Sequence, residues 1–486
     1  MKITSLFIAM VLAAILGLAG PAAAAPVEPP EVEAELQPGG SMVVEKVVQT
    51  PEIPPEPDIY FLADTTGSMG GVIAEVAANA HAVLTNISLL QPDAQFGVGN
   101  YKDFPYDSYA FQNQQGITDD TTAVSDAINA WTAGGGSDGP EGQFYALTEI
   151  TTNPAIGWRD GSTRIVVWFG DAPAHDPVPD AATGLGYDIT ESTVTADLQA
   201  AGVRVVAIST VTGTYYPDAL DDDPNNGGGD YATAYGITED GSSGQASRMA
   251  AATGGVHMTG VEPDEVVDAI LEGLGNLPIT ITPQVMDPCP YLDIGFEPAS
   301  QTAISGEPVR FTETIKVPED APQCHTLKCV VLFVDGNGNA VGEQLVSIHV
   351  LDVTPPKVWC IESVNPHGEN IPGEKRSDNA KEKAKNPDGF YQILAVDNCV
   401  EPGDIHIYVT DVDETEVFGP FAPGIVVKFT EDTEAAPSCK KIGSSNGQAG
   451  AVAHHIILPS DPIVVAVDPS GNVGICYGCL VPPPPK

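Results

Sequence analysis

DIYFLADTTGSMGG, at residues 58–71, carries the strongest fold signal in the chain. An unbroken apolar run leads into three oxygen-bearing side chains, Asp64, Thr66 and Ser68, and a helix-like segment follows. Such a run is typical of a strand buried on both faces of a parallel sheet. The turn behind that strand lies at the carboxyl edge of the sheet, where open α/β folds bind ligands. A carboxylate and two hydroxyls spaced two residues apart favour a hard cation such as Mg²⁺ or Ca²⁺.

Strand and helix patterns alternate from residue 58 to about residue 276. Alternation of this kind indicates an α/β domain with a doubly wound, mostly parallel sheet and helices on both faces. Apolar runs predict strands at 59–63, 96–101, 164–169, 203–210 and 256–259. Helices are predicted at 72–90, 121–133, 143–150, 192–201, 245–252 and 263–274.

The segments on either side of this domain differ in character. Residues 1–25 combine Lys2, an apolar core and small residues, which is the pattern of a signal peptide. The Pro- and Glu-rich stretch 26–57 predicts an extended linker. Beyond residue 278, period-two alternation predicts an immunoglobulin-like β-sandwich over 278–353, with a hairpin at 335–339. A second all-β module is expected at 354–486.

The charge balance restricts the partners. The 486 residues include 20 Lys and Arg against 66 Asp and Glu, a formal net charge of −46. Such a surface repels nucleic acid and anionic membranes and attracts cations. We therefore expect no nucleic-acid partner and no membrane insertion, and a well-solvated exterior is a simpler account of the charge than any partner-specific role.

All eight cysteines follow residue 288. An even number of cysteines in an exported chain predicts disulfides. A zinc site is the alternative, but Cys476 and Cys479 are the one close pair, and a tetrahedral zinc site needs a second.

Two further strand ends offer carboxylates. Asp171 follows the predicted strand 164–169, and Asp138 and Glu141 lie on a glycine-rich loop ahead of a predicted helix. Each piece has a plain alternative, because Thr66 and Ser68 can cap a helix and glycine-rich loops are often simple turns. Together, in this order after parallel-type strands, they favour a metal site.

The 64–68 turn resembles the D-x-S/T-x-S signature of von Willebrand factor A (vWA) domains. FGVGNYKD at 96–103, DGPEGQF at 138–144 and GDAPAH at 170–175 resemble segments of the integrin β-subunit I-like domain. The resemblance implies an adhesion site that holds Mg²⁺, or Mn²⁺ or Ca²⁺ in its place, and leaves a position for a partner's carboxylate. Carried over by position, its ligands are Asp64, Thr66, Ser68, Glu141 and Asp171.

The same resemblance implies a neighbouring Ca²⁺ site, formed by Asp103, Asp138, the Pro140 carbonyl and Glu141. Gly136 departs from it, because the family has Asn at that position. Residues 70–72 are Gly, Gly and Val where the family places acids, so no third site is expected.

The last module resembles the hyalin repeat (HYR), an immunoglobulin-like adhesion module. The similarity lies in DVTPP at 352–356 and in DPSGN at 468–472, which is followed by Cys476. It implies that Cys360 pairs with Cys476 or Cys479.

Three classes of function remain open. The first is a secreted or cell-surface adhesion protein that binds an acidic group of an extracellular protein or matrix ligand through a divalent cation. The second is an extracellular structural protein in which the metal only stabilises the fold. The third is an enzyme subunit, since metal-chelatase subunits carry vWA domains. The signal peptide and the lack of a phosphate-binding G-x-x-x-x-G-K-S/T sequence argue against that class, and we expect no enzyme.

Overall fold

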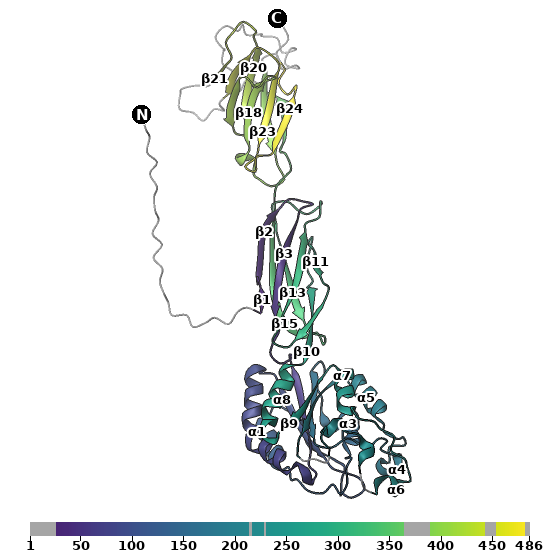
Figure 1. The fold of residues 1–486 in the computed structure, drawn as a ribbon. Helices are drawn as coiled ribbons and strands as arrows, with labels where there is room; N and C mark the ends of the chain where they lie inside the picture. The colour runs from purple at the N-terminus through teal and green to yellow at the C-terminus, as the bar shows by residue number, and fades with distance from the viewer. Residues whose placement is uncertain (1–25, 213–215, 228–229, 364–388, 443–452, 482–486) are drawn as a thin grey trace, which may run out of the picture.

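The computed structural model describes residues 26–212, 216–227, 230–363, 389–442 and 453–481. Three bodies follow one another in a row (Figure 1): an α/β domain, a middle β-sandwich and a C-terminal β-sandwich. The predicted signal peptide at 1–25 lies outside the described residues.

The α/β domain is built on a six-stranded sheet. Its strands are β4 (Pro57–Asp64), β5 (Gln95–Tyr101), β6 (Phe111–Thr118), β7 (Thr163–Gly170), β8 (Val203–Thr210) and β9 (Val256–Val261). They lie in the order β6-β5-β4-β7-β8-β9, and β6 at the edge runs antiparallel to β5 while the other pairs are parallel. The five predicted strands are confirmed. β6 was not predicted, because FQNQQGIT is half-buried and lacks an apolar run.

Helices cover both faces of the sheet because alternate residues of β4 face opposite sides. Ile59 and Phe61 pack with one set of helices, whereas Tyr60 and Leu62 pack with the other. The first face carries α1 (Gly70–Leu90), α2 (Thr121–Asn129) and α8 (Val266–Gly275), and the second carries α3 (Gln143–Thr152), α5 (Glu191–Ala200) and α7 (Gln245–Thr253). Shorter helices are η1 (Gly67–Met69), η2 (Pro154–Ile156), α4 (Asp180–Thr183), η3 (Ala219–Asp221), η4 (Pro224–Asn226), α6 (Tyr231–Tyr235) and η5 (Pro263–Glu265).

The segment Gly67–Leu90 is long and apolar enough to cross a bilayer, with a mean hydropathy of 1.3. Its buried side chains, which include Val72, Val76 and Val83, pack into the core of the α/β domain. Core packing therefore gives a reason for this composition.

The predicted linker is wrong for most of its length. Residues 27–49 form β1 (Val27–Glu28), β2 (Glu31–Leu36) and β3 (Ser41–Gln49) of the middle sandwich. β3 pairs along its whole length with β13 (Pro308–Lys316), and β2 pairs in parallel with β15 (Ala340–Val350). The Pro and Glu content masked an alternation in which every second residue of 44–48 turns inward. The α/β domain is thus inserted between β3 and β10 (Pro278–Val285) of a sandwich that was expected to begin at 278.

The middle sandwich consists of sheets β1-β3-β13-β11 and β12-β10-β14-β15-β2. Its other strands are β11 (Asp293–Glu297), β12 (Gln301–Ile304) and β14 (Thr326–Val334). The predicted hairpin joins β14 to β15, and its tip reaches the α/β domain: Asn337 Nδ2 donates to Thr163 Oγ1 at 3.0 Å and Asn339 Nδ2 to the Gly161 carbonyl at 3.2 Å. The insertion and these contacts hold the base of the α/β domain against the sandwich.

Within the described residues, the C-terminal sandwich consists of one sheet of five strands and one of four. The first contains β16 (Lys357–Glu362), β17 (Phe390–Val396), β20 (Val426–Glu431), β22 (Ala453–Leu458) and β21 (Ser438–Ile442); the second contains β19 (Val417–Phe421), β18 (His406–Asp411), β23 (Pro462–Val467) and β24 (Val473–Tyr477). A short helix, η7 (Pro402–Asp404), precedes β18.

All eight cysteines lie in described ranges. Six form the disulfides Cys289–Cys329, Cys324–Cys399 and Cys476–Cys479, and Cys360 and Cys439 are free thiols. The implied pairing of Cys360 with Cys476 or Cys479 is therefore wrong. A turn behind β24 brings the Cα atoms of Cys476 and Cys479 to 5.6 Å, so these two pair with each other.

Candidate metal centre

The turn after β4 holds the first carboxylate. Asp64 is the last residue of that strand and is buried. Thr66 donates to Asp64 Oδ1 from both its backbone N (2.8 Å) and its Oγ1 (2.7 Å). Among the described residues, Asp64 Oδ2 has no hydrogen-bond partner. The turn thus fixes the carboxylate through one oxygen and leaves the other without a donor.

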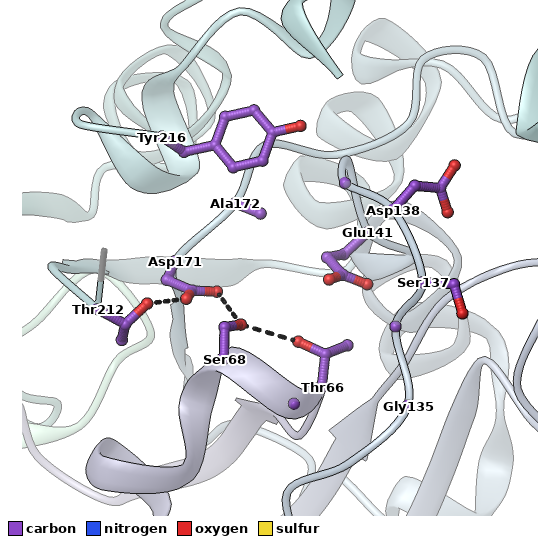
Figure 2. A pocket seen from close by; sticks show the side chains of 13 residues that line it. Thr66, Ser68, Gly135, Ser137, Asp138, Glu141, Asp171, Ala172, Thr212 and Tyr216 are labelled. Atoms are coloured by element: carbon purple, nitrogen blue, oxygen red, sulfur yellow. Dashed lines mark hydrogen bonds between the residues drawn. The ribbon is translucent and has the colours of Figure 1, made fainter. Parts of the chain in front are cut away.

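Asp171 joins this turn from the neighbouring strand, because β7 lies beside β4. Ser68 Oγ donates to Asp171 Oδ1 at 3.0 Å and lies 3.4 Å from Thr66 Oγ1. Thr212, just after β8, donates to the second Asp171 oxygen. Figure 2 shows this line of side chains from Thr212 through Asp171 and Ser68 to Thr66. Sequence reasoning missed Thr212, although its place after a predicted parallel strand puts it at the same edge.

Glu141 approaches from the glycine-rich loop ahead of α3. The loops around Glu141 and Asp171 pair through their backbones: Glu141 N donates to the Pro173 carbonyl at 2.9 Å, and His175 N to the Glu141 carbonyl at 3.1 Å. The Glu141 side chain is buried, and within the described part of the chain its Oε2 has no hydrogen-bond partner. In Figure 2 the carboxylates of Glu141 and Asp171 lie on either side of the Thr66 and Ser68 hydroxyls.

These side chains border an open cleft of about 540 Å³. Thr66, Ser68, Glu141 and Asp171 line it, and Asp64 lies behind Thr66. The structure therefore brings the five predicted adhesion-site residues to one place. Across the described ranges, however, the carboxylates of Asp64, Glu141 and Asp171 do not all come within 4.8 Å of one another. The two hydroxyls lie between them.

The electrostatics disfavour negative charge on these buried acids when no cation is beside them. Burial, followed by the charge of Asp171, raises the pKa of Asp64 to about 8 against the hydrogen bonds from Thr66 and the charge of Lys102. Burial, together with Asp64, Asp103 and Asp171, raises the pKa of Glu141 well above its ordinary value. Oxygen atoms that are buried without donors, beside two hydroxyls, are the ligand set that hard divalent cations take. The residues present therefore fit such an ion.

Lys102 connects the turn after β4 to the glycine-rich loop ahead of α3. Its Nζ donates to the Thr65 carbonyl at 2.6 Å and to the Gly134 carbonyl. This ammonium is nearly buried, so it ties the turn at Thr65 to the glycine-rich loop while its charge partly offsets that of Asp64. Its bonds to two carbonyls from distant loops could not be read from the sequence.

Three acids of the predicted second site lie near one another, since, in addition to burial, the charge of Asp103 raises the pKa of both Asp138 and Glu141. Across the described ranges, however, the carboxylates of Asp103, Asp138 and Glu141 do not all come within 4.8 Å of one another. Among the described residues, Asp103 Oδ2 and Asp138 Oδ1 have no hydrogen-bond partner. Asp103 Oδ1, however, lies 3.0 Å from Nε2 of the buried His175, and Glu239 Oε1 lies 2.5 Å from its Nδ1. Burial lowers the pKa of His175, but the two carboxylates outweigh the effect of burial and raise this pKa to about 9. A fixed imidazolium beside Asp103 therefore supplies part of the charge that a second cation would bring.

Steric crowding explains why residue 136 is a glycine. Gly136 has φ +60°, and a Cβ on it would lie 2.8 Å from Thr66 Cβ and 3.1 Å from Glu141 Oε1. Its N–H donates to Asp107 Oδ2 at 2.9 Å. The backbone here passes so close to the candidate ligands that a side chain, including the asparagine of the resembling family, does not fit without movement.

Comparisons of the sequence with known proteins agree with a vWA-like domain. Residues 27–185 match the family model described as "Integrin beta-like protein A-E, vWA-like". The alpha-protein kinase vwkA of Dictyostelium discoideum is 32% identical over 120 residues, and integrin beta-PS of Drosophila melanogaster is 26% identical over 138 residues. Each match covers 24% of this chain, but only 19% and 16% of the respective relative.

Among solved structures, a von Willebrand factor type A protein from Catenulispora acidiphila aligns over 66% of this chain and 72% of its own, with a TM-score of 0.32 and 12% identity. On the sequence matches, the chain contains a vWA-like domain with integrin beta-like relatives.

Proposed function

We propose that this chain is an exported adhesion or recognition protein whose vWA-like domain binds an acidic group of its partner through a divalent cation. The observation that carries the proposal is the pair of buried oxygens, Asp64 Oδ2 and Glu141 Oε2, which have no hydrogen-bond donor in the described ranges. A buried carboxylate without compensation is costly, so such atoms are retained where a cation or a ligand pairs with them. Ser68 stands exposed at the cleft beside them.

The first ion would be Mg²⁺, with Mn²⁺ or Ca²⁺ as substitutes. Thr66 and Ser68 would supply hydroxyl ligands, and the carboxylates of Asp64, Glu141 and Asp171 would balance the charge. Since these carboxylates are spread around the hydroxyls, some would act through water, which Mg²⁺ retains readily. A water on the cleft side is the position that a partner's carboxylate would take. A second ion, Ca²⁺, would be held by Asp103, Asp138, the Pro140 carbonyl and Glu141, more weakly because of the imidazolium of His175.

The partner would be an extracellular protein or matrix ligand that offers a carboxylate. The integrin beta-like relatives support adhesion or recognition as the class of function. The predicted signal peptide and the three disulfides support an extracellular or cell-surface location. The net charge of −46 disfavours nucleic acid and anionic membranes as partners. We propose a binding role rather than an enzymatic one.

The coordination chemistry can be tested with Mn²⁺ as the probe. Water-proton relaxation reports water molecules bound directly to Mn²⁺ on the protein. We expect a peptide with an Asp side chain to lower the relaxation enhancement by displacing such a water, and a matched Asn peptide to have little effect. Asp64→Asn should bind one Mn²⁺ fewer per chain than the wild type, whereas Asp126→Asn, on the exposed side of α2, should bind the wild-type number.

The purely structural alternative makes a different prediction. If the metal only stabilises the fold, Mn²⁺ still binds at Asp64 and raises the unfolding temperature, but the Asp and Asn peptides act alike. That result would defeat the adhesion proposal. Circular dichroism of Asp64→Asn separates loss of the ion from loss of the fold.

A further inference from the structure

Three carboxylates meet where the middle sandwich joins the C-terminal one. Asp352 lies just behind β15, Asp397 just behind β17 and Asp468 just behind β23. One carboxylate oxygen of each lies within 4.8 Å of those of the other two. In Figure 1 this junction is the narrow connection between the upper two bodies.

Two of these carboxylates keep a buried oxygen without a donor. Asp352 is only 9% exposed, and its Oδ2 has no hydrogen-bond partner among the residues the structure describes. Asp397 Oδ2 is also a buried atom without a hydrogen-bond partner among the described residues. The other oxygens already hold the local turns, since Asp352 Oδ1 accepts from Thr354 N (3.1 Å) and Asp397 Oδ1 from Cys399 N (2.7 Å). The two Oδ2 atoms therefore play no part in shaping the turns.

The third carboxylate, Asp468, is buried as well. Its two oxygens accept from the backbone N and the side-chain Nδ2 of Asn472, each at 2.9 Å. Asn472 Nδ2 also donates to the Asp352 carbonyl at 3.2 Å and so spans the junction. None of the ion pairs found in the described ranges involves these three acids, so three negative charges are gathered without a cationic side chain.

We propose that Asp352, Asp397 and Asp468 bind one Ca²⁺ ion that fixes the C-terminal sandwich to the middle one. Ca²⁺ takes six to eight oxygen ligands at about 2.3–2.6 Å. Three oxygens that all lie within 4.8 Å of one another place a shared ion at most about 2.8 Å from each, so small side-chain movements complete Ca²⁺ bonds. Mg²⁺ needs shorter bonds of about 2.0–2.1 Å in near-ideal octahedral geometry, whereas Ca²⁺ accepts flexible sets of oxygen ligands, so acids from three separate turns favour Ca²⁺. Waters and backbone carbonyls would fill the remaining positions.

The ion would complement the covalent link at this junction. Cys324 of the middle sandwich is bonded to Cys399, two residues beyond Asp397. A disulfide limits the distance between the two bodies but leaves rotation about its bonds. A cation held by one acid from the connecting segment and two from the C-terminal sandwich would restrict their angle. The inference is independent of the adhesion site in the α/β domain.

Equilibrium dialysis of the full chain against Ca²⁺ tests this site. The concentrations should span about 10⁻⁴–10⁻³ M, the dissociation range of extracellular calcium modules. We expect Asp352→Asn and Asp397→Asn each to bind one Ca²⁺ fewer per chain than the wild type. Asp413→Asn, an exposed acid of the same sandwich, should bind the wild-type number.

A second measurement guards against misfolded variants. Mass spectrometry of peptides from the digested, unreduced chain should still find the Cys324–Cys399 disulfide in Asp397→Asn. In small-angle X-ray scattering, Ca²⁺ should narrow the distribution of radii of gyration of the wild type and of Asp413→Asn. It should not narrow that of Asp397→Asn. The proposal is overturned if the disulfide-intact variants bind as many Ca²⁺ ions as the wild type. The Mn²⁺ experiment at Asp64 would be unaffected by that outcome.

Discussion

Gly136→Ala is expected to damage the candidate metal centre without touching a ligand. Gly136 has φ +60°, in the left-handed region, and a Cβ there would lie 2.8 Å from Thr66 Cβ. Gly134, two residues earlier in the same loop, is the matched control: its backbone is not left-handed, and a Cβ on it meets no atom of the described residues within 4 Å. The pair therefore separates steric pressure on Thr66 from a general loss of loop flexibility.

The magnitude follows from this geometry. A non-glycine residue in the left-handed region costs about 1–2 kcal/mol, and forcing a methyl group into a packed site costs about 1–3 kcal/mol. We expect Gly136→Ala to lower the free energy of unfolding of the metal-free α/β domain by about 2–4 kcal/mol, since the loop relaxes in part. To reach an ordinary 3.4 Å contact, Thr66 must retreat by about 0.6 Å. Because Mg²⁺ demands near-ideal geometry, its affinity should fall at least about tenfold, or 1.4 kcal/mol.

Isothermal titration with Mg²⁺ and urea unfolding in EDTA measure the two effects. Gly134→Ala should bind Mg²⁺ like the wild type and change stability by less than about 0.5 kcal/mol. If Gly136→Ala matches Gly134→Ala in both measurements, the close approach of the loop to Thr66 is wrong, and with it the steric reason for glycine at 136.

Three further predictions concern the rest of the chain. Lys46 Nζ lies 3.7 Å from Glu313 Oε2 and both side chains are fully buried, so Lys46→Met alone should destabilise the middle sandwich by about 3–5 kcal/mol and Lys46→Met/Glu313→Leu by much less; equal losses in urea unfolding would contradict this. Burial raises the pKa of Asp176 from 3.8 to about 6, so the folded state holds this proton more tightly, and its stabilising effect is lost as pH rises from about 4 to 6. Relative to Asp176→Asn, the free energy of unfolding of the wild type should therefore fall by about 1–2 kcal/mol over that window, after allowance for solvent screening, and a difference that does not vary with pH would refute it. Iodoacetamide applied to the denatured, unreduced chain should add two labels, at Cys360 and Cys439, and eight after reduction; mass spectrometry would show eight adducts without reductant if the three disulfides are absent.

The parts of the site that were predictable depend on local patterns. The apolar run of β4 and the spacing of Asp64, Thr66 and Ser68 identify a strand and the turn behind it. Asp171 could be placed because it follows another parallel-type strand, and parallel strands end at the same edge. Glu141 needed the resemblance of its loop to a known family, because a glycine-rich loop by itself predicts only a turn.

The supporting residues could not be predicted in the same way. Lys102 binds carbonyls of two loops, and His175 lies between acids from different segments. Glu313 sits on the buried face of β13, where its period-two position alone gives no hint of the buried Lys46 on the neighbouring strand β3. Each of these charges is tolerated only because a partner far away in the sequence reaches it.

The sequence by itself determined the α/β domain, the turn that carries Asp64 and the all-β character of the C-terminal half, because residue periodicity reports which face of each element is buried. Only the tertiary structure decided that residues 27–49 complete the middle sandwich, that Cys324 joins Cys399, and that Asp352 meets Asp397 and Asp468. Pairing between distant segments depends on which strand edges and side chains remain unsatisfied once the whole chain has folded. A local pattern, which repeats over a few residues, holds no record of that competition.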